Sequence, residues 1–149
     1  PDAGGAVADL RAAHGEETDL RIALTARERP DVTVAVPADP VLVDVLVAHE
    51  VDAALAAALD NVDRHAGPGA RAWVLLEGDS SGLEVTIRDD GVGAQLGDVF
   101  DAADRGRLGV SSSIRGRIED LGGTVTWTTR PGGGCVVRMT IPRTVKERA

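Results

Sequence analysis

The chain is organised around the stretch Ile87-Arg88-Asp89-Asp90-Gly91-Val92-Gly93. From Leu83 to Ile87, apolar residues alternate with polar ones, which is the pattern of a half-buried β-strand. Because successive side chains of a strand point to opposite faces, Asp89 continues the apolar face and Asp90 points to the polar side. A carboxylate at the end of a buried face needs a partner, and the two glycines allow close approach. A planar ligand that donates an amino group fits both needs, whereas an isolated Asp-Asp-Gly is more often a solvated turn.

Composition limits the classes of function. The 149 residues suit one domain, and a hydrophobic content of 43% is enough for its core. With two Trp, one Phe, no Tyr and a net charge of -8, the chain offers neither stacking platforms nor a basic surface, so we expect no nucleic-acid partner. The single cysteine excludes an internal disulfide and is compatible with a reducing cytosol. No apolar run could span a membrane, so no direct membrane contact is expected. The first residue is Pro1, which suggests an excised domain.

Periodicity predicts the remaining elements. Helical patterns cover residues 6–14, 18–28, 41–65 and 110–121, and strand patterns cover 31–36, 71–77, 83–89, 124–129 and 135–141. Residues 94–107 have little periodicity and are interpreted as a mobile lid. Strands and helices without regular alternation predict an α+β fold, with a mixed sheet covered on one face by two main helices. We expect a helical lead-in over residues 1–30 and the functional domain over 31–149.

The longest helical pattern carries two neighbouring strips of side chains. One is a core-facing apolar stripe formed by Val51, Leu55, Leu59 and Val62. At about 100° per residue, a second strip beside it is formed by Ala54, Ala57, Asn61 and His65, with Arg64 at its flank. A strip in this position can meet both the core and a ligand.

Three segments then suggest one cleft: the strip of Asn61, the turn after Asp89 and the helix start near Gly109. An amide oxygen suits Mg²⁺, which takes further oxygens from phosphates and water. Arg64 can pair with phosphate oxygens, and a helix start binds anions through free N–H groups. Taken singly, Asn61 and Arg64 are ordinary surface residues, His65 a helix-end residue favoured by the dipole and Ser111 a cap.

In combination, these motifs resemble a known family. Leu59-Asp60-Asn61-Val62-Asp63-Arg64-His65-Ala66 resembles the N box of the GHKL ATP-binding fold. Asp89-Asp90-Gly91-Val92-Gly93 resembles its first glycine box, and Arg107-Leu108-Gly109-Val110 its second. The tail, with Leu121-Gly122-Gly123 and Pro131-Gly132-Gly133-Gly134, is similar to sensor histidine kinases paired with NarL-type response regulators.

The resemblance covers roughly Val32 to Pro142 and implies a two-layer α/β sandwich of the GHKL type, with a mixed, mostly antiparallel sheet. It implies that Asn61 binds Mg²⁺, that Arg64 contacts phosphate and that Asp89 receives the adenine amino group of ATP. It assigns the remaining nucleotide contacts to His65, Gly91, Gly93, Gly109, Val110, Ser111 and Cys135, and makes residues 94–107 the ATP lid. The implied partners are a dimerisation domain of the same protein, which carries the phosphoacceptor histidine, and a NarL-type response regulator. The implied location is the cytoplasmic side of a membrane-anchored sensor kinase.

The sequence also departs from the family pattern. Ala57 stands where a glutamate is usual, Cys135 where a threonine is usual, and Arg107 replaces the first glycine of the second box. None of the three histidines lies in a phosphoacceptor motif, so the dimerisation domain is expected to be a separate segment. Two alternatives remain open: a serine kinase of the anti-sigma-factor class, and a degenerate module that binds nucleotide or a partner without phosphotransfer.

Overall fold

The computed structural model describes residues 16–67, 69–91, 108–130 and 133–142. Its helices are α2 (Leu20–Thr25), α3 (Val45–His65) and α5 (Leu108–Asp120). Its strands are β1 (Glu17–Asp19), β2 (Val32–Ala35), β3 (Leu42–Asp44), β4 (Ala72–Gly78), β5 (Gly82–Asp89), β6 (Thr124–Arg130) and β7 (Gly134–Pro142). The predicted helix over residues 6–14 lies outside the described residues.

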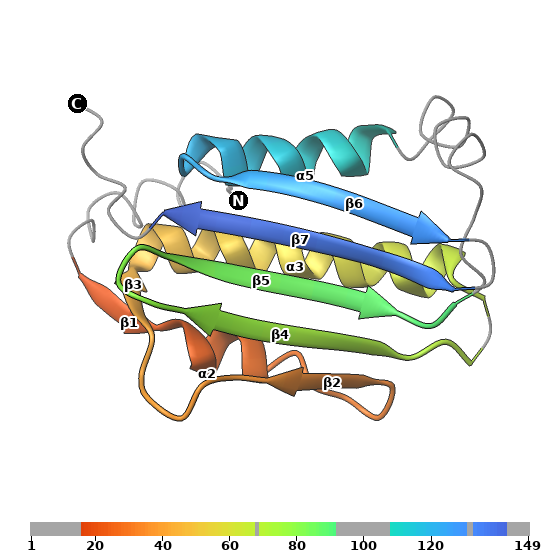
Figure 1. Ribbon diagram of the computed structural model, residues 1–149, viewed down its shortest axis with the longest axis horizontal. Coiled ribbons are helices and arrows are strands. Elements are labelled where there is room, and N and C mark those ends of the chain that lie inside the picture. The colour runs from red at the N-terminus through yellow and green to blue at the C-terminus, as the bar shows by residue number, and fades with distance from the viewer. Residues whose placement is uncertain (1–15, 68, 92–107, 131–132, 143–149) are drawn as a thin grey trace, which may run out of the picture.

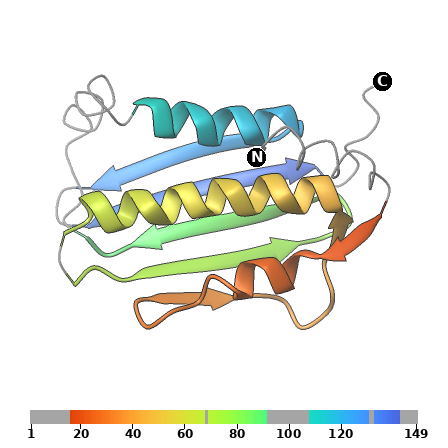
Figure 2. The same cartoon turned by 180° about the vertical axis from the view of Figure 1, so that it is seen from behind.

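The strands and helices form two layers. Five strands make one sheet in the order β2-β4-β5-β7-β6, in which only the β2–β4 pair is parallel. Figure 1 looks onto the strands, and Figure 2 shows α3 and α5 lying across the opposite face. The predicted mixed, mostly antiparallel sheet with helices on one face is therefore confirmed.

The core lies between these layers. The inward residues of β4, β5 and β7 are buried in alternation, as the period of two predicts. From α3, Val51, Leu55 and Leu59 are buried as predicted. Ala54, placed by the sequence in the neighbouring strip, is also fully buried, because α3 contacts α5 as well as the sheet and so has a wide covered arc.

Two predicted helices begin later than their patterns. Residues 42–44 form β3, which pairs antiparallel with β1, so α3 starts at Val45 and α2 at Leu20. Asp44 caps α3 by accepting a hydrogen bond from the Leu46 N–H at 2.8 Å. The predictions over 41–65 and 18–28 are wrong for these first residues, because an apolar run such as 41–47 satisfies both the strand and the helix pattern. The prediction over 18–28 is also wrong for its last three residues, because α2 ends at Thr25.

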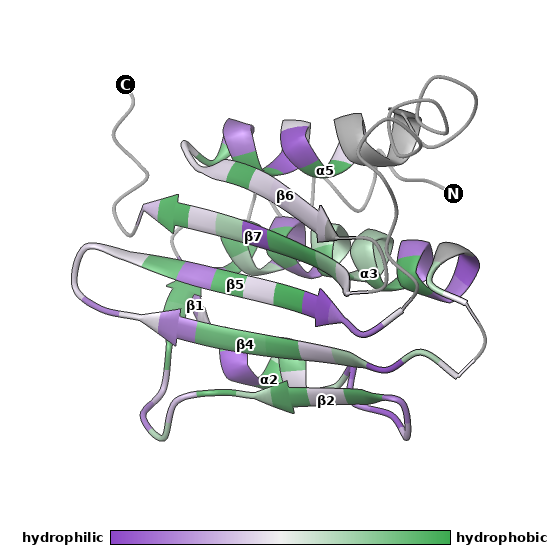
Figure 3. Cartoon of the chain, turned by 45° about the vertical axis from the view of Figure 1, so that its right-hand side comes forward, coloured by the Kyte–Doolittle hydropathy of each residue, from purple (hydrophilic) through white to green (hydrophobic). Residues whose placement is uncertain are grey.

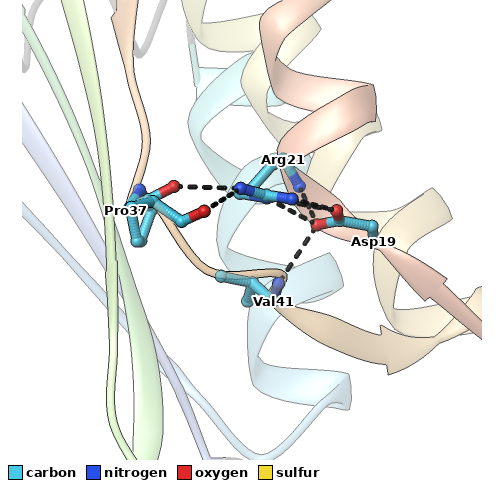
Figure 4. A network of polar contacts seen from close by, with 5 residues as sticks. Asp19, Arg21, Pro37 and Val41 are labelled. Carbon is cyan, nitrogen blue, oxygen red and sulfur yellow. Dashed lines mark hydrogen bonds and ion pairs between the residues drawn. The ribbon is translucent and has the colours of Figure 1, made fainter.

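A polar network at Asp19 holds α2 against the connection between β2 and β3 (Figure 4). The Asp19 carboxylate accepts hydrogen bonds from the backbone N–H groups of Arg21 and Val41, both at 3.1 Å. The Arg21 guanidinium pairs with this carboxylate at 2.9 Å and donates to the carbonyls of Pro37 and Ala38. The hydrogen bond from Arg21 is the main cause that lowers the pKa of Asp19 to about 2.

The described part of the lead-in packs with the sheet. Leu20 and Leu24 of α2 are fully buried in the same core as α3. The boundary at residue 30 between the lead-in and the functional domain remains a prediction. Among the described helices, none is both long enough and apolar enough to cross a membrane.

The middle of α5 offers a stability test at Gly116. A Cβ placed there meets no atom within 4 Å, so Gly116→Ala introduces no clash. Because glycine is a poor helix residue, we expect the free energy of unfolding to rise by about 0.5–1 kcal/mol, measured by urea denaturation. Gly122→Ala is the matched control and should lower it, since Gly122 has a φ of +84°. A Gly116→Ala protein less stable than the parent would show that this position of α5 does not have room for a methyl group.

Candidate functional site

The candidate site lies at one end of the sandwich. There the last turns of α3, the end of β5, the start of β7 and the first turn of α5 come together, at the right of Figure 1 and the left of Figure 2. The segments of Asn61, Asp89 and Gly109 thus lie at the same end of the sandwich, and the cleft expected between them remains a prediction. Gly93 and the predicted lid over residues 94–107 lie outside the described residues.

Asp89 is the buried carboxylate of this site. It is 6% exposed and is the only buried charged side chain within the described ranges, whereas Asp90 is exposed, as strand parity predicts. Its Oδ1 accepts a hydrogen bond from the Gly91 N–H at 2.9 Å. Burial raises the pKa of the Asp89 carboxyl above its ordinary value, and hydrogen bonds from the backbone N–H groups of Gly91 and Cys135 act in the opposite direction. A group in this state is suited to accept a hydrogen bond from a ligand.

Two glycines allow the backbone to close around Asp89. A Cβ at Gly91 would clash with the carbonyl oxygen of Ala66, the residue that caps α3. A Cβ at Gly134 would clash with the Asp89 carbonyl oxygen, and Gly134 also has a φ of +78°. The turn after β5 thus packs directly on the end of α3, and the start of β7 packs on Asp89.

Asn61 lies on α3 one turn before that contact. Its side chain is half-buried, and Ala57, one turn earlier, packs partly buried against the core. No group of three or more His, Cys, Asp or Glu side chains that could hold a metal occurs in the described parts of the chain. A cation beside the Asn61 amide oxygen would therefore take most ligands from phosphate and water oxygens, and this donor set fits Mg²⁺.

Arg64 is close to the site but forms a surface ion pair. Its Nε lies 3.1 Å from the Asp60 Oδ2, and both side chains are mostly exposed. Exposed pairs of this kind contribute about 0–1 kcal/mol, so Arg64 can exchange Asp60 for another anion at little expense. His65 is the last residue of α3, and its side chain is not among those described.

The other two elements complete the rim of the site. Cys135 lies opposite Asp89 in the antiparallel register of β5 and β7, half-buried against the core. Val137, Met139 and Ile141 are buried on the same face, as the period of two in a strand requires. Gly109, Val110 and Ser111 belong to the first turn of α5, whose backbone N–H groups have no partner within the helix. Side-chain positions of Val110 and Ser111 are not described.

Sequence reasoning missed two contacts of this site, those of Ala66 with Gly91 and of Gly134 with Asp89. The available signals were the glycine run before Cys135 and the end of the helical pattern before Gly67. Neither signal names the residue on the other side of the contact.

A family model described as "Histidine kinase-, DNA gyrase B-, and HSP90-like ATPase" matches residues 47–145. The chain belongs to this family. It is thus an ATP-binding domain of the histidine-kinase-like type.

Solved structures with the same fold include histidine kinase domains. The histidine kinase domain from the Erythrobacter litoralis EL346 blue-light activated histidine kinase is 28% identical, with a TM-score of 0.64 over 89% of this chain and 69% of that one. The ATP-binding domain of PrrB from Mycobacterium tuberculosis is 23% identical, with a TM-score of 0.64 over 88% of this chain and 98% of that one. The catalytic domain of histidine kinase ThkA is 18% identical, with a TM-score of 0.69 over 89% and 98%. The fold is therefore that of histidine kinase catalytic domains.

The buried state of Asp89 predicts how stability depends on pH. Since the folded-state pKa is raised, the folded protein holds the proton more tightly than the unfolded chain. The free energy of unfolding should therefore fall as pH rises from the ordinary carboxyl pKa through the raised one. Asp89→Asn cannot ionise and should lose this decrease, so that it gains stability relative to the parent above that window.

The measurement is urea denaturation of both proteins across this pH range. Asp90→Asn is the control, because the Asp90 side chain is exposed and its charge is therefore not desolvated by burial. Parallel pH profiles for the parent and Asp89→Asn would contradict the raised pKa.

Proposed function

We propose that this chain is the catalytic domain of a sensor histidine kinase, which binds ATP and Mg²⁺ and phosphorylates a histidine on a dimerisation domain of the same protein. The phosphoryl group would then pass to a response regulator of the NarL type. The observation that carries the proposal is the buried carboxylate of Asp89 at the meeting point of α3, β5 and β7. The kinase identity draws support from the histidine kinase domain that is 28% identical over 89% of this chain.

The adenine end of the site is proposed at Asp89. Among the described residues, only backbone N–H groups donate to the Asp89 carboxylate, so it can accept one more hydrogen bond. The exocyclic amino group of adenine is a planar donor of the right kind. Gly91 and Gly134 keep side chains out of the space around this carboxylate. Cys135 contributes an apolar, polarizable wall beside it, with a weaker hydrogen-bonding group than a hydroxyl.

The phosphate end is proposed along the last turns of α3 and the first turn of α5. Asn61 would supply one oxygen to Mg²⁺, which neutralises phosphate charge, and Arg64 would leave Asp60 to pair with a phosphate oxygen. The N–H groups at Gly109, Val110 and Ser111 would bind phosphate at the positive end of the α5 dipole. In phosphoryl transfer such positioning and charge neutralisation provide most of the catalysis.

One observation favours a second candidate, a module that binds nucleotide without transferring phosphate. Ala57 is an apolar, partly buried residue one turn before Asn61, on the side of α3 where a carboxylate could position a proton acceptor. The three carboxylates nearest to Ala57 in sequence are already paired: Asp60 with Arg64, Asp52 with Arg27, and Asp63 with Arg29. In this reading ATP binds, but the acceptor histidine is not activated.

Binding of the nucleotide is tested by calorimetry with a non-hydrolysable ATP analogue and Mg²⁺. A hydrogen bond to a charged group contributes roughly 1.5–3 kcal/mol, so Asp89→Asn should weaken binding by about ten-fold or more. Asp90→Asn, with the neighbouring exposed carboxylate, should bind like the parent. Equal affinity of Asp89→Asn and the parent, with unchanged circular dichroism, would refute the adenine assignment.

Catalysis is tested by restoring the carboxylate at position 57. If proton handling limits transfer, Ala57→Glu should raise the rate of phosphohistidine formation on a supplied dimerisation domain at saturating ATP. General-base contributions are typically about 10²–10⁴-fold, so even a partial gain is measurable. Ala56→Glu, rotated by about 100° on α3, is the matched control and should give no gain. A fast parent, unchanged by Ala57→Glu, would eliminate the second candidate.

A further inference from the structure

The face of the sheet without helices carries an exposed apolar surface on β4. Ala72, Val74 and Leu76 of this strand point into the core, but Trp73 and Leu75 point outward and are 36% and 40% exposed. Figure 3 shows continuous hydrophobic colour over the middle of β4, without the alternation of a half-solvated strand, between a pale start and a hydrophilic end. Strands that are apolar on both sides are typical of sheets covered on both faces. In the described chain only one face of β4 is covered.

Neighbouring strands extend this surface. In the register of the sheet, Trp73 lies between Thr33 and Arg88, and Leu75 lies between Ala35 and Thr86. The Arg88 guanidinium covers part of the Trp73 ring at 5.4 Å from its centroid. We call the outward side chains of Trp73, Leu75, Glu77 and Arg88 the open-face patch.

Charge is distributed unevenly along the open-face patch. Arg88 lies at the end beside Trp73, while Glu77 and its register partner Glu84 lie at the other end. Glu84 is paired with Arg138 at 2.7 Å. Neither Arg88 nor Glu77 forms an ion pair with any other residue of the described ranges. Within the described ranges, the patch thus has one cation and one anion that lack an ion-pair partner, separated by the apolar residue Leu75.

We propose that the open-face patch docks onto the same patch of a second copy of this chain. A two-fold axis that crosses the strands at Leu75 would place Leu75 against Leu75 and stack the two sheets face to face, the usual packing of sheets. It would bring Arg88 of each copy over the acidic end of the other, where Glu77 has no ion-pair partner among the described residues. Such a self-complementary arrangement is the signature of a two-fold interface.

The size of the face matches a weak dimer. At about 3.3 Å per residue and 4.8 Å between strands, five strands of about seven residues present roughly 500 Å². Two such faces bury about 1,000 Å², the lower end for specific interfaces. The net charge of -8 also opposes association of two copies. The contact would therefore strengthen when two catalytic domains are held together by another part of the protein.

Sedimentation equilibrium of the full 149-residue chain tests the apolar centre of the patch. The parent should show a concentration-dependent monomer–dimer equilibrium. Leu75→Glu should weaken dimerisation at least ten-fold, because it places a charge at the centre of the contact. Ile22→Glu is the matched control, since Ile22 is 70% exposed on α2, outside the patch, and should leave the equilibrium unchanged. A parent that stays monomeric up to about millimolar concentration overturns the proposal and leaves the patch to a different partner.

A charge-exchange experiment tests the orientation without altering the apolar residues. Arg88→Glu and Glu77→Arg should each be monomeric, because like charges then meet in their homodimers. An equimolar mixture of the two variants should dimerise, since every contact pairs an arginine with a glutamate again. Circular dichroism checks that both variants fold. Dimerisation of either variant alone at the level of the parent, or failure of the mixture to associate, overturns the proposed two-fold arrangement.

Discussion

The antiparallel pairing of β5 with β7 is the constraint on which the site depends. It places Asp89 opposite Cys135 and brings Gly134 against the Asp89 backbone, where no side chain would fit. A carboxylate buried in this way has lost much of its hydration, and two backbone N–H groups compensate only part of that loss. Among the described residues no cation pairs with Asp89, and a buried charge of this kind is a candidate for a functional role.

The alternation of β5 explains why much of this arrangement could be predicted from the sequence. A period of two assigned Asp89 to the buried face and Asp90 to solvent, and the structure agrees. The helical period of α3 likewise identified Val51, Leu55 and Leu59 as core residues. These inferences succeeded because each concerns a single element whose side-chain directions follow from local geometry. The order of the motifs, through their resemblance to the GHKL family, then predicted the fold.

Contacts between elements were not predictable in the same way. Residues 41–47 are apolar at nearly every position, so their pattern did not decide between a strand and a helix. Pairing with β1 decided it, and that partner lies more than twenty residues away in sequence. The burial of Ala54 similarly depends on α5, and the need for Gly91 depends on the carbonyl of Ala66. Glycine patterns indicate that something approaches closely, but not which atom.

Adjacent residues of β5 carry charges on its two opposite faces. Arg88 belongs to the solvent face beside Trp73, and Asp89 belongs to the buried face that carries the candidate site. A slip of the register by one residue would exchange the two faces, bury the arginine and expose the carboxylate. Such a slip would also expose the side chains of Val85 and Ile87 to solvent. Burial of the apolar residues of β5 therefore stabilises the observed register. The same burial that stabilises the sheet therefore fixes which of the two neighbouring charges faces the candidate site. Residues on the solvent face of β5 can thus be substituted without changing the side chains on its buried face.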